Sequence, residues 1–219
     1  LPIAVFTFTF MNTSSSQQTV RIFQSQQNIV GWKGHADCSS GSCDNWGGNV
    51  NTPVQSTKNK GYGGINFENP SLASSDEFFG NLTLSSIPTS SNSKTSVIVS
   101  ATDENDLWKQ FVDASDIDIA NAKSPSKASA SKTSWSGAVV QTVDIPANST
   151  ATVTFALSWY FPNRMRETSV GANYDTILPS RLGNSYNNTF SNSTDVITYF
   201  DSNVNLIDLT RTYVNAAFS

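Results

Sequence analysis

Residues 150–161 read TATVTFALSWYF, and apolar side chains alternate in them with smaller or polar ones. A period of two is the pattern of a β-strand, whose successive side chains point to opposite faces of a sheet. Pro162 ends the strand, because proline has no amide hydrogen for the sheet ladder. One face is expected to carry Val153, Phe155, Leu157 and Trp159, and the other Thr152, Thr154, Ala156 and Ser158.

Similar signals extend outward from this strand along the chain. PANS at residues 146–149 is typical of a hairpin turn, so residues 138–145 are expected to form the partner strand. FTFTF at residues 6–10 alternates as well, which predicts three phenylalanines on one buried face. Further strands are expected at residues 19–23, 65–67, 81–85 and 96–100. Six or more antiparallel strands predict a mainly β protein built as an antiparallel β-sandwich.

Two helices are expected beside the strands. TDEN at residues 102–105 supplies a cap and acidic first-turn residues, and LWKQFV at 107–112 continues with an apolar stripe, so a short helix interrupts the sandwich. Residues 194 to about 215 carry apolar side chains near helical spacing, which predicts a long C-terminal helix. We expect a sandwich domain at residues 1–193 and a linker helix at 194–219 that leaves it. Trp108, Trp135 and Trp159 lie in periodic segments and are expected in the core.

Residues 31–64 show no periodicity and are rich in Gly, Asn, Ser and Lys. A segment of this length without regular structure is usually a functional loop. Trp32, Trp46 and Tyr62 lie around it, and sugars stack on exposed aromatic rings. These three residues are therefore candidates for a carbohydrate site, and ordinary packing within the loop is the alternative.

The composition excludes several classes of protein. Charged residues make up 14% of the chain, whereas about 25% is usual, and Ser, Thr and Asn account for 78 of the 219 residues. A net charge of −4 gives no electrostatic footprint for nucleic acid or for an anionic membrane. No apolar run approaches the ~18 residues of a transmembrane helix. A hydrophobic content of 37% is too high for a wholly disordered chain.

The two cysteines point to an oxidising compartment. Cys38 and Cys43 flank SSGS, a turn-forming tetrapeptide that can bring two sulfur atoms together, so a disulfide is the first interpretation. A metal site with His35 and Asp37, and two free thiols, are the alternatives. A disulfide favours an extracellular or secreted protein.

Five acceptor triplets for N-glycosylation are also compatible with a secreted protein. With 22 Asn and 56 Ser or Thr, however, chance alone supplies about as many, so their number does not itself indicate secretion. The candidate sites are Asn12, Asn81, Asn148, Asn187 and Asn192.

Other candidate chemistry has simpler interpretations. His35 is the single histidine, and no G-x-S-x-G motif accompanies it, so a loop-packing role is favoured over a catalytic one. Asp113, Asp116 and Asp118 are spaced so that Ca²⁺ binding is conceivable, but the Gly and closing Glu of an EF-hand loop are missing. A solvated acidic turn is the favoured interpretation. No metal site, no cofactor and no catalytic residue are therefore expected.

Several segments, taken in order, resemble the N-terminal domain of glycoside hydrolase family 116, the family of the non-lysosomal glucosylceramidase or bile-acid β-glucosidase. The resemblance covers nearly the whole chain, and the ordered set of segments is more specific than any one of them. The segments are LPIAVFTFTFMN (1–12), IFQSQQNIVGW (22–32), SVIVSATDENDLWKQF (96–111), TVTFALSWYFPNR (152–164) and LGNSYNNTFSNSTDVITYF (182–200).

The resemblance implies a β-sandwich accessory domain of a retaining β-glycosidase. In that family the nucleophilic Glu and the acid/base Asp lie in a separate C-terminal (α/α)₆ barrel, which would be this domain's partner, and the substrate is a β-glycoside or glycolipid. The domain itself would brace the barrel and shape access to it. If residues 31–64 reach over the barrel, His35, Trp46 and Arg164 are candidates to contact substrate. The alternative is a stand-alone extracellular carbohydrate-binding or structural β-sandwich module.

Overall fold

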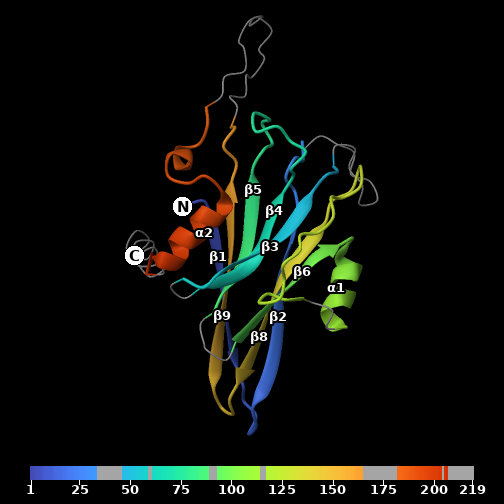
Figure 1. Cartoon of the computed structure of the whole chain (residues 1–219). Helices are drawn as coiled ribbons and strands as arrows, with labels where there is room; N and C mark the ends of the chain where they lie inside the picture. Colours follow the sequence, from blue (N-terminus) through green and yellow to red (C-terminus); the bar gives the residue numbers. More distant parts are fainter. Residues whose placement is uncertain are drawn as a thin grey trace, which may run out of the picture.

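The computed structural model describes residues 1–33, 46–58, 61–88, 93–113, 117–164, 182–203 and 205–206. Within them two antiparallel sheets pack face to face, which confirms the predicted sandwich (Figure 1). One sheet has the order β1-β9-β5-β4-β3 and the other β2-β8-β6-β7. The strands are β1 (Ile3–Met11), β2 (Gln18–Gln27), β3 (Val50–Ser56), β4 (Tyr62–Glu68), β5 (Asn81–Ile87), β6 (Ser93–Ala101), β7 (Ile117–Asp118), β8 (Ser136–Ile145) and β9 (Thr150–Tyr160). The helices are α1 (Glu104–Val112), the 3₁₀ turn η2 (Ser185–Asn188) and α2 (Ser193–Ser202).

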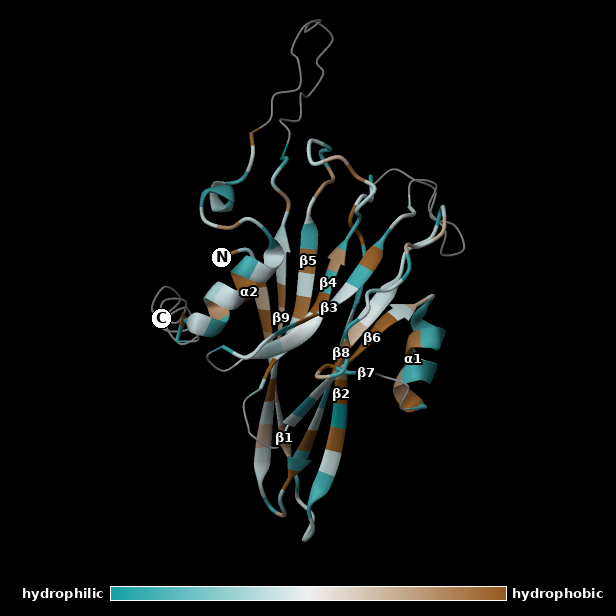
Figure 2. Ribbon diagram, in the orientation of Figure 1, coloured by the Kyte–Doolittle hydropathy of each residue, from teal (hydrophilic) through white to brown (hydrophobic). Residues whose placement is uncertain are grey.

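Strand β9 is a central strand of the five-stranded sheet, between β1 and β5. Its apolar face points into the sandwich, where Phe155 is fully buried and Val153 nearly so. The alternation of hydrophobic and hydrophilic residues along the strands is visible in Figure 2. The opposite face of β9 is buried too, since Ala156 and Ser158 have no exposed surface and α2 packs over them. The sequence pattern thus predicted the two faces correctly.

The prediction for residues 6–10 was wrong in one respect. Phe10 packs against the core, but Phe6 and Phe8 remain 40% and 41% exposed. The reason is their place in the sheet: β1 is an edge strand, so neighbouring side chains cover its inward face from one side only. Phe8 nevertheless lies edge-on to Phe155, with ring centroids 6.4 Å apart.

Part of the predicted long loop is regular structure. Residues 50–56 form β3, so the expectation of a loop was wrong for them. Residues 62–68 form β4, which confirms the strand predicted at 65–67 and shows that it begins within the expected loop. The glycine and asparagine residues of these strands interrupt the alternation of apolar and polar side chains by which a strand is predicted. Pro53 fits because β3 is the other edge of the sheet, where a missing amide hydrogen leaves no neighbouring strand unpaired.

Helix α1 lies on the outer face of the four-stranded sheet (Figure 1). Its N-cap is Asp103, whose side chain accepts a hydrogen bond from the amide of Asp106, as the sequence suggested. Trp108 was expected in the core, but it is 58% exposed. The helix buries Leu107 instead, and the Trp108 ring rests beside Phe23 at 6.2 Å between centroids. Trp135 and Trp159 are partly buried.

Helix α2 lies on the outer face of the five-stranded sheet. It begins after Asn192, whose side chain accepts from the amide of Asp195, and it ends at Ser202 with Asn203 as C-cap. The prediction of one helix from residue 194 to about 215 was therefore wrong, because the helix is only 10 residues long. Val196, Ile197 and Phe200 are buried, so this helix packs against the sandwich rather than leaving it. Residues 207–219 lie outside the described part of the chain.

Among the described residues, no helix has the length and apolar character needed to cross a bilayer.

The two phenylalanines that face each other in the β1–β9 register offer a test of this packing. Phe155→Ala should lower the free energy of unfolding by about 3–5 kcal/mol, because it empties a fully buried site. Phe6→Ala is the matched control, and it should cost less than about half as much, since Phe6 is 40% exposed. Urea unfolding followed by tryptophan fluorescence measures both, and equal losses would contradict the description of β1 as a half-open edge.

Candidate functional site

The loops at one end of the sandwich are organised by three asparagines that have no exposed surface, Asn28, Asn49 and Asn51. We call this the loop end: β2, β4, β6 and β9 finish here, and β3, β5 and β8 begin (Figure 1). The side-chain amide of Asn28 donates to Asn51 Oδ1 at 3.0 Å, and Asn28 Oδ1 accepts from Asn49 Nδ2 at 3.1 Å. These residues, called the asparagine cluster below, join segments that are distant in sequence.

The asparagine cluster also satisfies backbone groups at the strand ends. Asn28 Nδ2 donates to the carbonyls of Val50 and Glu68, and Asn51 Nδ2 donates to the carbonyl of Val99 at 2.8 Å. Buried peptide groups that lack partners are costly, so each of these bonds fixes the position of a strand end. Strands β2, β3, β4 and β6 are thereby held together across both sheets.

Further loops attach to this cluster. The amide of Asn49 donates to Ser129 Oγ at 3.0 Å, and the amide of Ser129 donates to the carbonyl of Asn49 at 2.9 Å, which fastens residues 121–135 to the start of β3. Gly48 has φ +77°, and a Cβ there would lie 2.7 Å from Ser71 Oγ, so only glycine fits. The loop end is a connected set of segments rather than a collection of independent loops.

Two of the three predicted substrate-contacting residues lie at the loop end. Trp46 precedes β3, is partly buried, and its carbonyl accepts from the amide of Lys132 at 2.6 Å. Its indole nitrogen is buried and has no hydrogen-bond partner among the described residues. Arg164 is exposed just after β9, and its carbonyl accepts from the amide of Leu182 at 2.8 Å. His35 lies outside the described residues.

The predicted aromatic group of Trp32, Trp46 and Tyr62 is not assembled in one place. Trp32 is 41% exposed near the loop end, but Tyr62 starts β4 at the opposite end. The chain between them crosses the sandwich as β3, which the sequence analysis missed. Tyr62 is nearly buried and bonds through its hydroxyl to Thr198 of α2 at 3.2 Å, and burial raises the pKa of that hydroxyl. Tyr62 therefore serves packing.

Two other predicted groups are placed only in part. Cys38 and Cys43 lie outside the described residues, so the disulfide stays a prediction. Of the acidic cluster, Asp113 is the C-cap of α1, and Asp118 Oδ2 is 2.9 Å from the ammonium of Lys94. Asp116 lies outside the described residues. Among the described residues, no three His, Cys, Asp or Glu side chains gather in a way that suits a metal ion.

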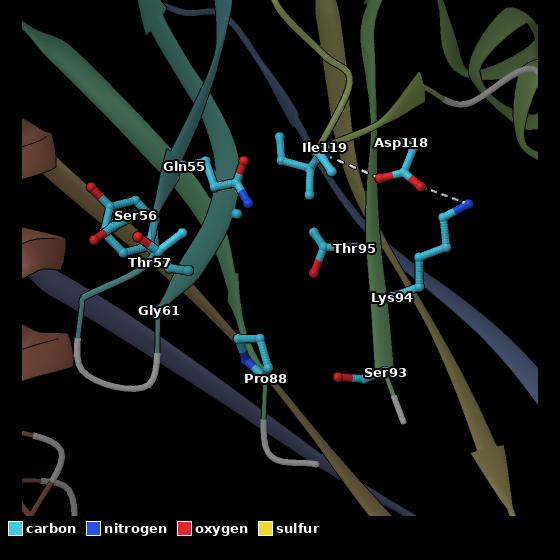
Figure 3. Close-up of a pocket in the computed structure, with 13 residues that line it drawn as sticks. Gln55, Ser56, Thr57, Gly61, Pro88, Ser93, Lys94, Thr95, Asp118 and Ile119 are labelled. Carbon is cyan, nitrogen blue, oxygen red and sulfur yellow. Dashed lines mark hydrogen bonds and ion pairs between the residues drawn. The ribbon is translucent and has the colours of Figure 1, made fainter. Parts of the chain in front are cut away.

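A pocket of about 460 Å³ opens between the two sheets, away from the loop end (Figure 3). Gln55, Ser56 and Thr57 line one side, and Thr95, Asp118 and Ile119 the other. In the described part of the chain, the lining residues are Gln55, Ser56, Thr57, Gly61, Tyr62, Gly63, Pro88, Ser93, Lys94, Thr95, Asp118, Ile119 and Ala120. No sequence motif predicts this pocket, because its residues come from the ends of separate strands.

The pocket is lined by both polar and apolar groups, and its two charged side chains, Lys94 and Asp118, pair with each other. The hydrogen bond from Lys94 holds the pKa of the Asp118 carboxyl below its ordinary value of 3.8. Whatever stability this pair contributes is therefore present above that ordinary value and is lost as the pH falls through the lower folded value. Among the described residues, Asp118 is the one carboxylate in the lining, whereas glycoside hydrolysis needs two that face each other.

Comparison with known families now identifies the chain. Residues 1–206 match the family described as "beta-glucosidase 2, glycosyl-hydrolase family 116 N-term". The chain belongs to this family. A search of curated proteins finds no match.

Membership agrees with the sandwich seen here and with the resemblance noted in the sequence. The matched range includes α2, which packs on the sandwich. Membership of a family of N-terminal β-glucosidase domains implies a catalytic domain in the same protein.

The asparagine cluster predicts a large and specific loss of stability. Asn28→Ala should lower the free energy of unfolding by about 3 kcal/mol or more, because it leaves several buried donors and acceptors without partners. Asn105→Ala is the matched control: Asn105 is exposed on α1, where alanine is the better helix former, so its effect should be near zero. Thermal unfolding of the two variants measures the difference. Similar melting temperatures would show that the cluster does not hold the loop end.

Proposed function

We propose that this chain is a non-catalytic domain that braces the catalytic barrel of a β-glucosidase-like enzyme and shapes the approach of its substrate. The observation that carries the proposal is the loop end, where the asparagine cluster holds several surface segments in fixed positions. Membership of the family supports a catalytic domain as the partner. The substrate class is a β-glycoside or glycolipid, as the resemblance to family 116 implies.

The loop end has the side chains expected of a contact surface. Ile29 is 37% exposed, Trp32 41% and Leu182 60%, and all three lie in segments that meet at this end. Lys33 adds a cation–π contact, with its ammonium 5.7 Å from the centre of the Phe78 ring. Aromatic and aliphatic groups of this kind form the centres of protein interfaces. Because the described segments at this end are already held by hydrogen bonds, less conformational entropy is lost when they bind.

Trp46 and Arg164 lie on segments that border the same surface. In this proposal Trp46 and Arg164 lie toward the substrate path, while Trp32 and Leu182 contact the barrel. The prediction for His35 stays a prediction, because His35 lies outside the described residues. A domain of this kind acts on catalysis indirectly, by holding the barrel's active-site surroundings in one geometry.

Two exposed tryptophans on different faces test the orientation. In the complete enzyme, Trp32→Ala should lower kcat/KM roughly tenfold, equivalent to about 1.4 kcal/mol, because it removes an aromatic side chain from the proposed contact. Trp108→Ala is the matched control. Trp108 is also exposed, but it belongs to α1 on the outer face of the four-stranded sheet, away from the proposed contact. Steady-state kinetics with an aryl β-glucoside measure both. A larger loss for Trp108→Ala than for Trp32→Ala would contradict the proposal.

We also propose an extracellular location for the protein. The proposal is supported by the low charge of the chain, by its excess of Ser, Thr and Asn, and by the spacing of Cys38 and Cys43. Fractionation of the source cells, followed by alkylation of the secreted protein without reduction, examines both points. Protein confined to the cell interior, or two alkylated cysteines, would count against it.

The pocket of Figure 3 favours a second candidate function, the binding of a neutral sugar. Hydroxyl and amide side chains such as Gln55 and Thr95 can bond to sugar hydroxyls, while Ile119 and Pro88 offer apolar surface to the C–H groups of the ring. Titration with cellobiose, followed by NMR chemical shifts, should then perturb the pocket residues, and Gln55→Ala should weaken the binding. Gln27→Ala, exposed on β2, should leave it unchanged. Absence of any shift in the pocket at millimolar cellobiose would remove this function.

A further inference from the structure

The asparagines of the five acceptor triplets differ in how exposed they are and in the hydrogen bonds that their side chains make. An N-linked oligosaccharide is attached to the side-chain nitrogen, Nδ2, so a folded acceptor needs an Nδ2 that is exposed and not used by the structure. We propose that Asn148 is the N-glycosylation site within residues 1–219 and that Asn12, Asn81, Asn187 and Asn192 carry no glycan. The inference rests on the extracellular location proposed above.

Asn148 meets both requirements. It is an exposed residue in the turn between β8 and β9, with φ +51°, a left-handed conformation that asparagine adopts more readily than most residues. Its backbone amide donates to the carbonyl of Ser14 at 3.2 Å, which fixes the turn. Within the described residues its side-chain amide makes no hydrogen bond. Thr150, the third residue of the triplet, is exposed as well.

Asn12 is the opposite case, although it lies in the neighbouring turn. It is 6% exposed, and its Nδ2 donates to the carbonyls of Ile145 at 2.9 Å, Pro146 at 3.0 Å and Ser16 at 2.8 Å. A sugar on this nitrogen would break the bonds that join the two turns. A chain glycosylated there would therefore not reach this structure.

Asn81 is excluded by the burial of its triplet. Its Oδ1 accepts from the amide of Ser193 at 2.7 Å, beneath the start of α2. Thr83, the third residue of the triplet, has no exposed surface, and its hydroxyl lies 2.7 Å from that of Ser193. A glycan on the Asn81 side chain would lie next to the start of α2, whose Ser193 amide depends on Asn81 Oδ1.

The last two triplets are occupied by local hydrogen bonds. Asn187 Nδ2 donates to the carbonyl of Pro162 at 2.9 Å. Asn192 is the partly buried N-cap of α2, where its Oδ1 accepts from the amide of Asp195 at 2.8 Å and from Thr194 Oγ1 at 2.5 Å. Ser193, in the middle of that triplet, has no exposed surface. The amide of Asn192 is thus held in one orientation against the helix.

The position of Asn148 fits a glycan in the assembled protein. The β8–β9 turn lies at the end of the sandwich opposite the loop end, so an oligosaccharide there stays clear of the proposed barrel contact (Figure 1). Met11, which is 68% exposed, pairs with Thr150 in the β1–β9 register, and Phe8 is 41% exposed on the same strand. An oligosaccharide beside this edge would cover apolar side chains that the fold leaves in solvent.

The modification requires a lipid-linked oligosaccharyl pyrophosphate as donor. A bond forms between Asn148 Nδ2 and the anomeric carbon of the oligosaccharide, and the bond from that carbon to the pyrophosphate breaks. The amide nitrogen gives up one proton, and the lipid pyrophosphate leaves with the bonding electrons. No oxidant or reductant takes part.

The test is site mapping on the full-length protein, produced through the secretory pathway of a eukaryotic host. Peptide-N-glycosidase treatment in ¹⁸O-labelled water should mark position 148 alone among the five asparagines. Asn148→Gln should remove all glycan from the peptides of residues 1–219. Thr150→Ala should do the same without altering the turn residue, whereas Thr150→Ser should retain the glycan.

Asn192→Gln is the matched control and should leave the glycan mass unchanged. An unmodified Asn148, or a glycan on any of the other four asparagines, would overturn the assignment. The location is judged separately by fractionating the source cells. A chain that is glycosylated at Asn148 in the secretory host but confined to the interior of its own cells would refute the extracellular proposal and leave the site assignment standing.

Discussion

The hydrogen bonds of Asn28 are the constraint on which the arrangement of the loop end depends. This one side chain, without exposed surface, donates to the carbonyls of Val50 and Glu68 and to Asn51 Oδ1, and it accepts from Asn49 Nδ2. In a sandwich the two sheets are held together mainly by non-directional hydrophobic contact, which does not fix how strand ends and loops are aligned. Directional bonds at the strand ends supply that alignment. This alignment positions the segments that carry Trp32, Trp46 and Arg164.

A second constraint acts on the five-stranded sheet, which is covered on both faces. Its inward face forms the main core with Phe155 and Phe67, and its outward face lies under α2. The outward side chains are short, and Ser158 Oγ donates to the carbonyl of Ser193 at 2.8 Å, at the start of the helix. Small polar residues let α2 approach the sheet closely while their hydroxyls remain bonded. The mixed polarity of β9 therefore reflects two different buried environments rather than one buried and one solvated face.

Local pattern predicted much of the fold, and its failures have physical causes. The alternation of residues 150–161 and the cap at Asp103 depend on neighbours in sequence, so both were predicted correctly. The exposure of Phe6 depends on strand order, which no local pattern contains. The same holds for the candidate site. Trp46 and Arg164 were proposed from the length of the expected loop and its aromatic content. The asparagine cluster was missed because it joins residues from different strands, and asparagine is more often a turn residue than a buried one.

Buried hydrogen bonds explain part of the unusual composition of the chain. Scarce charge with abundant Ser, Thr and Asn first suggested an extracellular protein, but many of these residues are buried and bonded, among them Asn51, Thr83 and Ser86. Burying a charged group costs several kcal/mol unless it is paired, whereas a neutral amide or hydroxyl with partners costs far less. A sandwich that aligns its strand ends through buried side chains must therefore use uncharged polar residues. That requirement alone would lower the charged fraction, whatever compartment the protein occupies.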